Sequence, residues 1–185
     1  YIMEAPTWNP SAETPRMGSI RAQFILESLR ELEEEIKEIG GSIEFIKGRA
    51  VDEIPRLMES FGAEHCYAQK EDAWEETEQE RLLANQINLI LTGGKGIWEE
   101  ADLPFALESL PAVFSSFRRK VEKKMQVRSL FRSPKSMPCS WKPKTELPTL
   151  TSLGYEECSK DERAVLDFRG GAREAKKWMH QWIWE

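Results

Sequence analysis

The chain has 185 residues, of which 40% are hydrophobic and 31% are charged, and its net charge is -6. This length supports one main hydrophobic core. The acidic balance argues against a protein that its overall field draws to nucleic acid or to an anionic membrane surface.

The chain has three cysteines, which lack the close pairing of a zinc site. Their number and spacing favour a reducing intracellular compartment. A chloroplast or another organelle is left open. No apolar run approaches the roughly 20 residues that a membrane helix requires. We therefore expect a soluble intracellular protein without membrane insertion.

The first long predicted element is an amphipathic helix over residues 19–39. Apolar side chains recur there at spacings of four and three, which places them on one helix face: Ile25, Leu29, Leu32, Ile36 and Ile39. Gly40-Gly41 predicts the end of this helix. Residues 42–46 then alternate between polar and apolar, which predicts a strand.

The order of helix and strand repeats twice more. Residues 51–61 predict a helix that Gly62 ends, and residues 64–68 predict a short strand. A helix over residues 74–86 then leads into a strand over residues 88–92. Strands separated by single helices are typical of βαβ units. The fold class that we predict is therefore α/β, with a doubly wound, parallel, Rossmann-like sheet.

The remainder of the chain predicts a connector with few long elements. Prolines interrupt it at positions 104, 111, 134, 138, 143 and 148. One helix is predicted over residues 112–125, and a last helix over residues 172–184 follows Gly170-Gly171.

Several short motifs occur in the same order as in one known family. They are Arg21 to Leu29, Ala68 to Glu71, Asp102-Leu103-Pro104-Phe105, Leu110 to Glu122 with its Phe117-Arg118 pair, Leu147-Pro148, Leu153-Gly154 and Gly170 to Ala175. Together they resemble the N-terminal α/β antenna domain of the photolyase/cryptochrome family, in particular that of the DASH cryptochromes.

The resemblance implies three parts. These are a photolyase-like α/β domain over residues 1–105, a helix with a proline-rich interdomain connector over residues 106–169, and the start of a helical, flavin-type domain over residues 170–185. Residues 1–6 align with the second strand of the family's domain, so its first strand, which is central in such a sheet, is missing. Either a longer chain or another polypeptide would then supply that strand.

The resemblance also implies a function. The chain would be part of a blue-light-dependent flavoprotein, a DNA repair photolyase or a DASH-type photoreceptor, and would hold the antenna chromophore without being catalytic alone. We expect no FAD in this chain, and FAD with a folate-type antenna in a longer photolyase-like protein. The expected partners are the missing flavin domain or another protein chain, with DNA left open. The alternative is a degenerate domain that acts as a structural or docking subunit of a larger assembly.

Three residues are candidates for binding the chromophore. Glu71 and Asp72 follow a predicted strand, at the sheet edge where α/β proteins place ligands. Their carboxylates would accept hydrogen bonds from a pterin ring, whereas the alternative is an ordinary solvated loop. The loop from Gly93 to Gly96 lacks the spacing of a phosphate-binding loop and is interpreted as a turn, with Trp98 beside it as a wall residue.

Two further groups of residues are candidates for contact surfaces. Between Phe114 and Lys144 there are ten lysines or arginines and a single acid. Contact with a partner or with phosphates is one interpretation and a solvated helix face is the other, for Arg118, Arg119, Lys120, Lys123, Lys124 and Arg128. Trp178 and Trp182 share a face of the last helix and are predicted to pack against another domain or chain.

Overall fold

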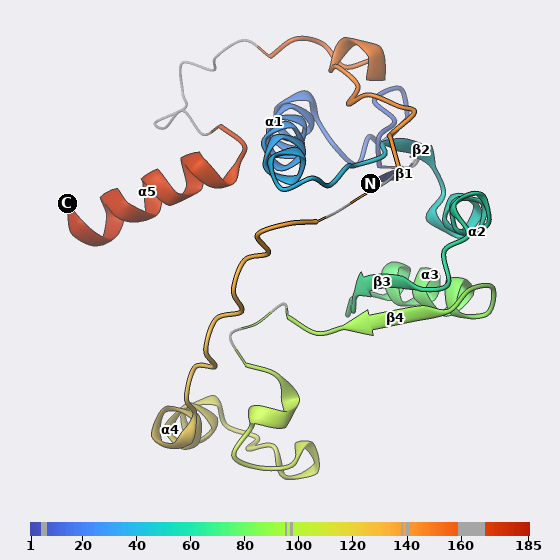
Figure 1. Ribbon diagram of the computed structural model, residues 1–185. Coiled ribbons are helices and arrows are strands. Elements are labelled where there is room, and N and C mark those ends of the chain that lie inside the picture. Colours follow the sequence, from blue (N-terminus) through green and yellow to red (C-terminus); the bar gives the residue numbers. More distant parts are fainter. Residues whose placement is uncertain (5–6, 95, 97, 138, 140, 159–168) are drawn as a thin grey trace. The chain divides into compact units, whose positions relative to one another are not determined.

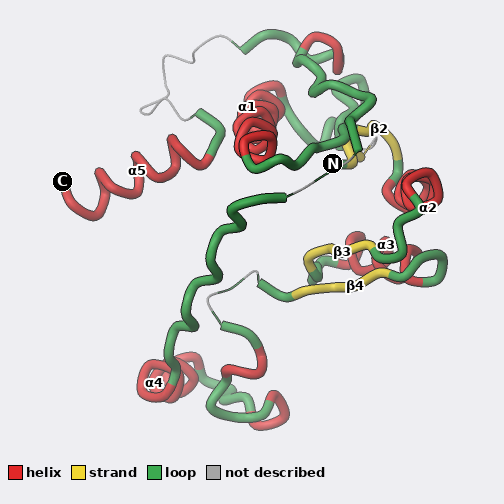
Figure 2. Tube along the Cα trace, in the orientation of Figure 1, coloured by secondary structure: helices red, strands yellow, loops and turns green. Residues whose placement is uncertain are grey.

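The computed structural model describes residues 1–4, 7–94, 96, 98–137, 139, 141–158 and 169–185 (Figure 1). The chain divides into two compact units. The first consists of Tyr1–Glu53 and Pro134–Glu185, and the second of Ile54–Ser133. Both units contain parallel β-strands and α-helices (Figure 2), which confirms the predicted α/β class.

The first unit is built on one parallel strand pair and a long helix. Strand β1 (Ile2–Glu4) pairs with β2 (Ile46–Gly48), and α1 (Ser19–Glu38) connects them. The unit also contains α5 (Ala172–Trp184). Its core joins residues from the strand, the helix and the connector, because their side chains are all buried in one cluster: Met3, Trp8, Met17, Ala22, Leu26, Leu153 and Tyr155.

Strand β2 lies further along the chain than its predicted position at residues 42–46. The backbone before it has other partners. The Phe45 N–H donates to Thr145 Oγ1 at 3.0 Å, and that hydroxyl is 2.7 Å from the Phe45 carbonyl oxygen. The amino group of Tyr1 donates to the Glu44 carbonyl oxygen at 2.6 Å. The Thr145 hydroxyl thus satisfies the backbone of Phe45. The Tyr1–Glu44 bond, with the Ile46 N–H that donates to the Tyr1 carbonyl oxygen at 3.0 Å, continues the pairing of β1 with β2.

The second unit contains the other strand pair. Helix α2 (Ala50–Phe61), which begins in the first unit, leads into β3 (Cys66–Gln69). Helix α3 (Trp74–Ala84) then connects β3 to β4 (Leu89–Thr92), and the two strands are parallel. Two short 3-10 turns, Glu100–Asp102 and Leu107–Ser109, precede α4 (Phe114–Lys124). The predicted strands at residues 64–68 and 88–92 therefore form a parallel pair.

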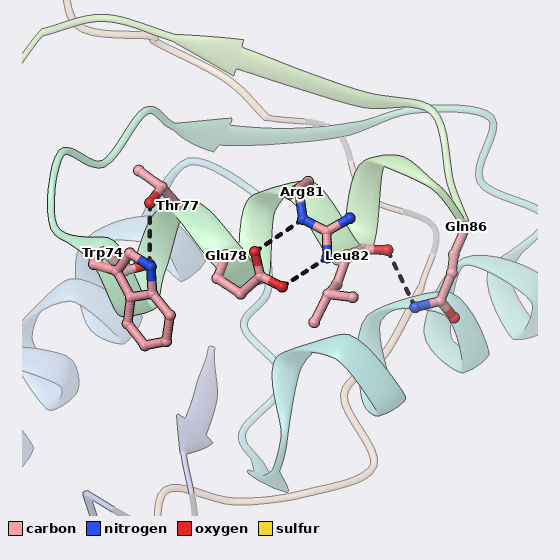
Figure 3. Close-up of polar contacts among 6 residues, drawn as sticks. All are labelled: Trp74, Thr77, Glu78, Arg81, Leu82 and Gln86. Atoms are coloured by element: carbon pink, nitrogen blue, oxygen red, sulfur yellow. Dashed lines mark hydrogen bonds and ion pairs between the residues drawn. The ribbon is translucent and has the colours of Figure 1, made fainter.

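Polar contacts along α3 stabilise it from its first turn to its end (Figure 3). Arg81 makes two parallel hydrogen bonds to the Glu78 carboxylate, at 2.8 and 2.7 Å, and thereby lowers the pKa of Glu78. The Gln86 amide donates to the Leu82 carbonyl oxygen at 3.3 Å just beyond the helix. The Gln86 side chain therefore satisfies a carbonyl group of the last turn of α3.

The boundaries of the two compact units differ from those of the three expected domains. The boundaries at residues 105 and 169 stay a prediction. Within the part of the chain that the structure describes, no helix is long and apolar enough to cross a membrane.

Candidate functional site

The candidate site is a depression of about 770 Å³ in the second unit, at the edge where β3 and β4 end. The two strands are parallel and Gln69 pairs with Thr92, so the residues that follow them emerge at the same edge. Open α/β sheets bind ligands just outside the carboxyl ends of their strands. The described lining residues are Lys70, Asp72, Gly93, Gly94, Gly96, Trp98, Glu99, Glu100, Ala101, Phe105, Ala106, Leu107 and Glu108.

Two glycines shape the loop after β4. Gly94 has a φ of +127°, which side chains of L-residues rarely adopt. A Cβ atom on Gly93 would stand 2.8 Å from Glu99 Oε1. The backbone therefore passes close to the Glu99 carboxylate, and Gly93, Gly94 and Glu99 all line the depression.

Two aromatic side chains contribute apolar walls. Trp98 is 40% exposed, so part of its indole is open to solvent. Phe105 is supported from behind by α4, because its ring packs edge-on against Phe117 with 5.8 Å between centroids. The Lys120 ammonium lies 5.5 Å from the centroid of the Phe105 ring. One aromatic wall is thus fixed by a helix and the other borders solvent.

An ion-pair network fixes the turn that forms one side of the depression. Glu99 and Asp102 cap the same 3-10 turn reciprocally, and the Glu99 N–H donates to Asp102 Oδ2 at 2.9 Å. The Arg128 guanidinium bonds Asp102 Oδ1 at 2.6 Å and lies 3.4 Å from the Glu99 carboxylate. The backbone N–H of Glu99 and then Arg128 hold the pKa of Asp102 below its usual range.

We expect the Asp102 carboxyl to titrate below about pH 3.9, the ordinary aspartate value. Because the folded pKa is lowered, the contact stabilises the turn above the unfolded value, and this stabilisation is lost as the pH falls through the folded pKa. Carboxyl NMR shifts followed against pH measure this. Arg128→Gln should raise the pKa of Asp102, whereas the control Arg132→Gln should not. An unchanged titration in Arg128→Gln would refute the role of Arg128.

The structure brings two of the three predicted chromophore residues to the depression. Asp72 and Trp98 line it. Glu71 is not among the described lining residues, and its N–H donates to Glu80 Oε1 of α3 at 2.6 Å. Sequence reasoning missed Lys70 and Glu99 as lining residues. It quoted Phe105 only as part of a family motif, and that motif was the available signal for this wall.

Four of the six predicted basic contact residues are engaged within their own unit. Arg118 pairs with Glu122 at 2.8 Å, and Arg119 donates to the Ser115 carbonyl oxygen at 3.2 Å. Lys120 and Arg128 make the contacts described above. Lys123 and Lys124 are exposed in the last turn of α4, where positive charges interact favourably with the helix dipole. A contact of these residues with a partner stays a prediction.

The tryptophans of α5 are unequal. Trp178 is half-buried and Trp182 is 82% exposed. Trp184, at the helix end, is 74% exposed. Among the described residues, α5 has no fully buried side chain. The interface predicted for Trp178 and Trp182 stays a prediction.

The comparisons with known proteins agree with the α/β fold. The family model for DNA photolyase matches residues 1–139. The chain belongs to the DNA photolyase family. It is 28% identical over 175 residues to a cryptochrome DASH of Synechocystis, covering 91% of this chain and 36% of that protein.

Two further matches are also to cryptochromes. The cryptochrome DASH of Arabidopsis thaliana, named as chloroplastic/mitochondrial, is 30% identical over 183 residues, which cover 92% of this chain and 31% of that protein. The crystal structure of a Synechocystis cryptochrome matches the whole chain with a TM-score of 0.84 and 25% identity, and the match covers 40% of the cryptochrome. The chain thus spans about a third of the length of the curated relatives it matches.

Proposed function

We propose that this chain is the antenna-holding part of a blue-light-dependent flavoprotein, a DNA repair photolyase or a DASH-type photoreceptor. The observation that carries the proposal is the depression at the carboxyl ends of β3 and β4, lined by Asp72 and Trp98. Its volume of about 770 Å³ falls in the range of small-molecule sites. Members of the family bind FAD and an antenna chromophore.

The lining suits a folate-type chromophore. A pterin ring has N–H donors and two flat faces, so it needs a carboxylate acceptor and an aromatic wall. Asp72 supplies the acceptor and the exposed part of the Trp98 indole supplies a stacking surface. Lys70, at the same edge, offers a cation for the carboxylates of a glutamyl tail.

In the whole protein, FAD would be held by a domain beyond this chain, and this chain would bind and orient the antenna and support that domain. It would not be catalytic alone. An organelle location, the chloroplast included, is part of the proposal and rests on the name of the Arabidopsis relative.

Fluorescence titration of the chain with methenyltetrahydrofolate tests the proposal, with a deazaflavin and FAD as competing probes. We expect saturable binding of the folate, weakened in Asp72→Asn because the amide offers a weaker acceptor than the carboxylate. Glu64→Gln changes an exposed acid outside the depression and is the matched control. Saturable binding of FAD with no binding of folate would overturn the assignment.

A second candidate function, that of a structural or docking subunit, is favoured by the exposed apolar face of α5. Trp182 and Trp184 together present a large apolar surface to water, and such surfaces mark contacts with other proteins.

We therefore expect the isolated chain to show exposed indole fluorescence and light scattering that rises with protein concentration. Trp182→Gln should reduce the scattering. A monomer whose indoles are shielded from an added quencher would contradict this expectation.

A further inference from the structure

The start of α5 lies directly on α1 within the first unit. The contact joins residues 143 positions apart: the Gly170 N–H donates to Glu27 Oε2 at 2.8 Å, and the Gly171 N–H donates to Ser28 Oγ at 3.0 Å. The Arg173 N–H donates to Glu31 Oε1 at 2.8 Å. Three side chains of α1 thus accept hydrogen bonds from three backbone N–H groups around the N-terminus of α5, those of Gly170, Gly171 and Arg173.

These bonds replace an ordinary helix cap. The first N–H groups of a helix lack partners within it, and a Ser, Thr, Asp or Asn at the N-cap usually accepts one. The N-cap of α5 is Gly171, which has no side chain to do so. Glu31 of α1 accepts the N–H of Arg173 instead, and its negative charge lies at the positive end of the α5 dipole.

The acceptors are themselves held in place. The Gln23 amide donates to Glu27 Oε1 at 2.8 Å, which leaves Oε2 of the same carboxylate for Gly170. The Ser28 hydroxyl donates to the Phe24 carbonyl oxygen at 2.8 Å, so its lone pairs face Gly171. Arg173 adds a longer contact of 3.4 Å to the Glu34 carboxylate.

The approach is so close that only glycine fits. A Cβ atom on Gly170 would overlap the Phe24 carbonyl oxygen and stand 2.8 Å from the Ser28 backbone nitrogen. The backbone of a helix interior cannot yield without breaking its own hydrogen bonds. At Gly171 a Cβ atom would overlap the Glu31 carboxylate, and its φ is +113°.

We propose that Glu27, Ser28 and Glu31 form a docking site on α1 for residues 170–173, and that this site fixes the direction in which the chain enters α5. The occupant is a segment of this same chain, bound through its backbone. The docking site would orient whatever polypeptide follows α5, the flavin-binding domain if the proposed function is right. The docking contact itself does not depend on any chromophore.

Amide hydrogen exchange and backbone NMR relaxation of the full 185-residue chain test this proposal. In the unmodified chain, the amides of Gly170, Gly171 and Arg173 should be protected, and α5 should tumble together with α1. Gly170→Ala should reduce the protection of these amides by tenfold or more and give α5 faster local motion.

Two comparisons separate the docking site from general damage to the fold. The double variant Glu27→Ala, Glu31→Ala removes the acceptors without a steric clash and should also release α5. The controls are Gly18→Ala, where a Cβ meets nothing within 4 Å, and Glu38→Ala on the exposed end of α1. Protection of the Ala22 and Leu26 amides reports that α1 is intact.

Loss of protection at residues 170–173 alone, with α1 intact, would support the proposal. It would be overturned if these amides exchanged freely in the unmodified chain, or if both variants left them protected. Folate binding by the same variants is a separate readout, so failure of the proposed function can be told apart from failure of the docking site.

Discussion

Replacing Trp8 by alanine is expected to lower the free energy of unfolding by about 3–5 kcal/mol. Trp8 is 2% exposed and lies in the cluster that joins β1, α1 and the connector. Its ring packs edge-on against Tyr155 at 6.4 Å between centroids. Removal of the indole would leave a cavity in the cluster where these segments pack together.

Urea denaturation followed by circular dichroism measures the change. Trp74→Ala is the matched control, because that side chain is 78% exposed at the start of α3. If the Trp8 and Trp74 variants were equally stable, the cluster around Trp8 would not be the core of the first unit.

Trp98→Ala is expected to weaken binding of methenyltetrahydrofolate by about tenfold, which corresponds to about 1.4 kcal/mol. An aromatic pair contributes about 0.5–1.5 kcal/mol beyond the area that it buries, and loss of the indole also removes part of the wall. The stability of the fold should change little, because Trp98 is 40% exposed.

The same fluorescence titration gives this result, again with Trp74→Ala as control. That variant should bind as the unmodified chain does, since Trp74 does not line the depression. Equal affinities of all three proteins would place the chromophore elsewhere.

The parts of the fold that depend on local sequence could be predicted. The spacing of apolar residues predicted α1, because a helix buries its apolar face whichever segment of the chain packs against it. The pair β3–β4 followed from two short apolar runs flanking a helix. The position of Asp72 beside the depression could be predicted because it follows the carboxyl end of a parallel strand, where α/β proteins place ligands. Its role as a chromophore ligand stays a prediction.

Features that depend on distant residues could not be predicted. Strand β2 begins later than expected because Thr145, 100 positions away, bonds the backbone of Phe45. Glu71 is not among the described lining residues of the depression, and its backbone N–H donates to Glu80 of α3, nine positions further on. The glycines at positions 170 and 171 were predicted to precede a helix and, from the family resemblance, to begin a flavin-type domain, whereas their close approach to α1 depends on the three-dimensional arrangement.

The most direct test of the account is the position of a bound folate on the chain. Addition of methenyltetrahydrofolate to isotope-labelled protein should shift the NMR signals of the Gly93 and Gly94 amides and of the Trp98 indole, saturating at one ligand per chain. The signals of α1 and α5 should stay unchanged. Shifts confined to α5, or none at the depression while the folate binds, would contradict the account.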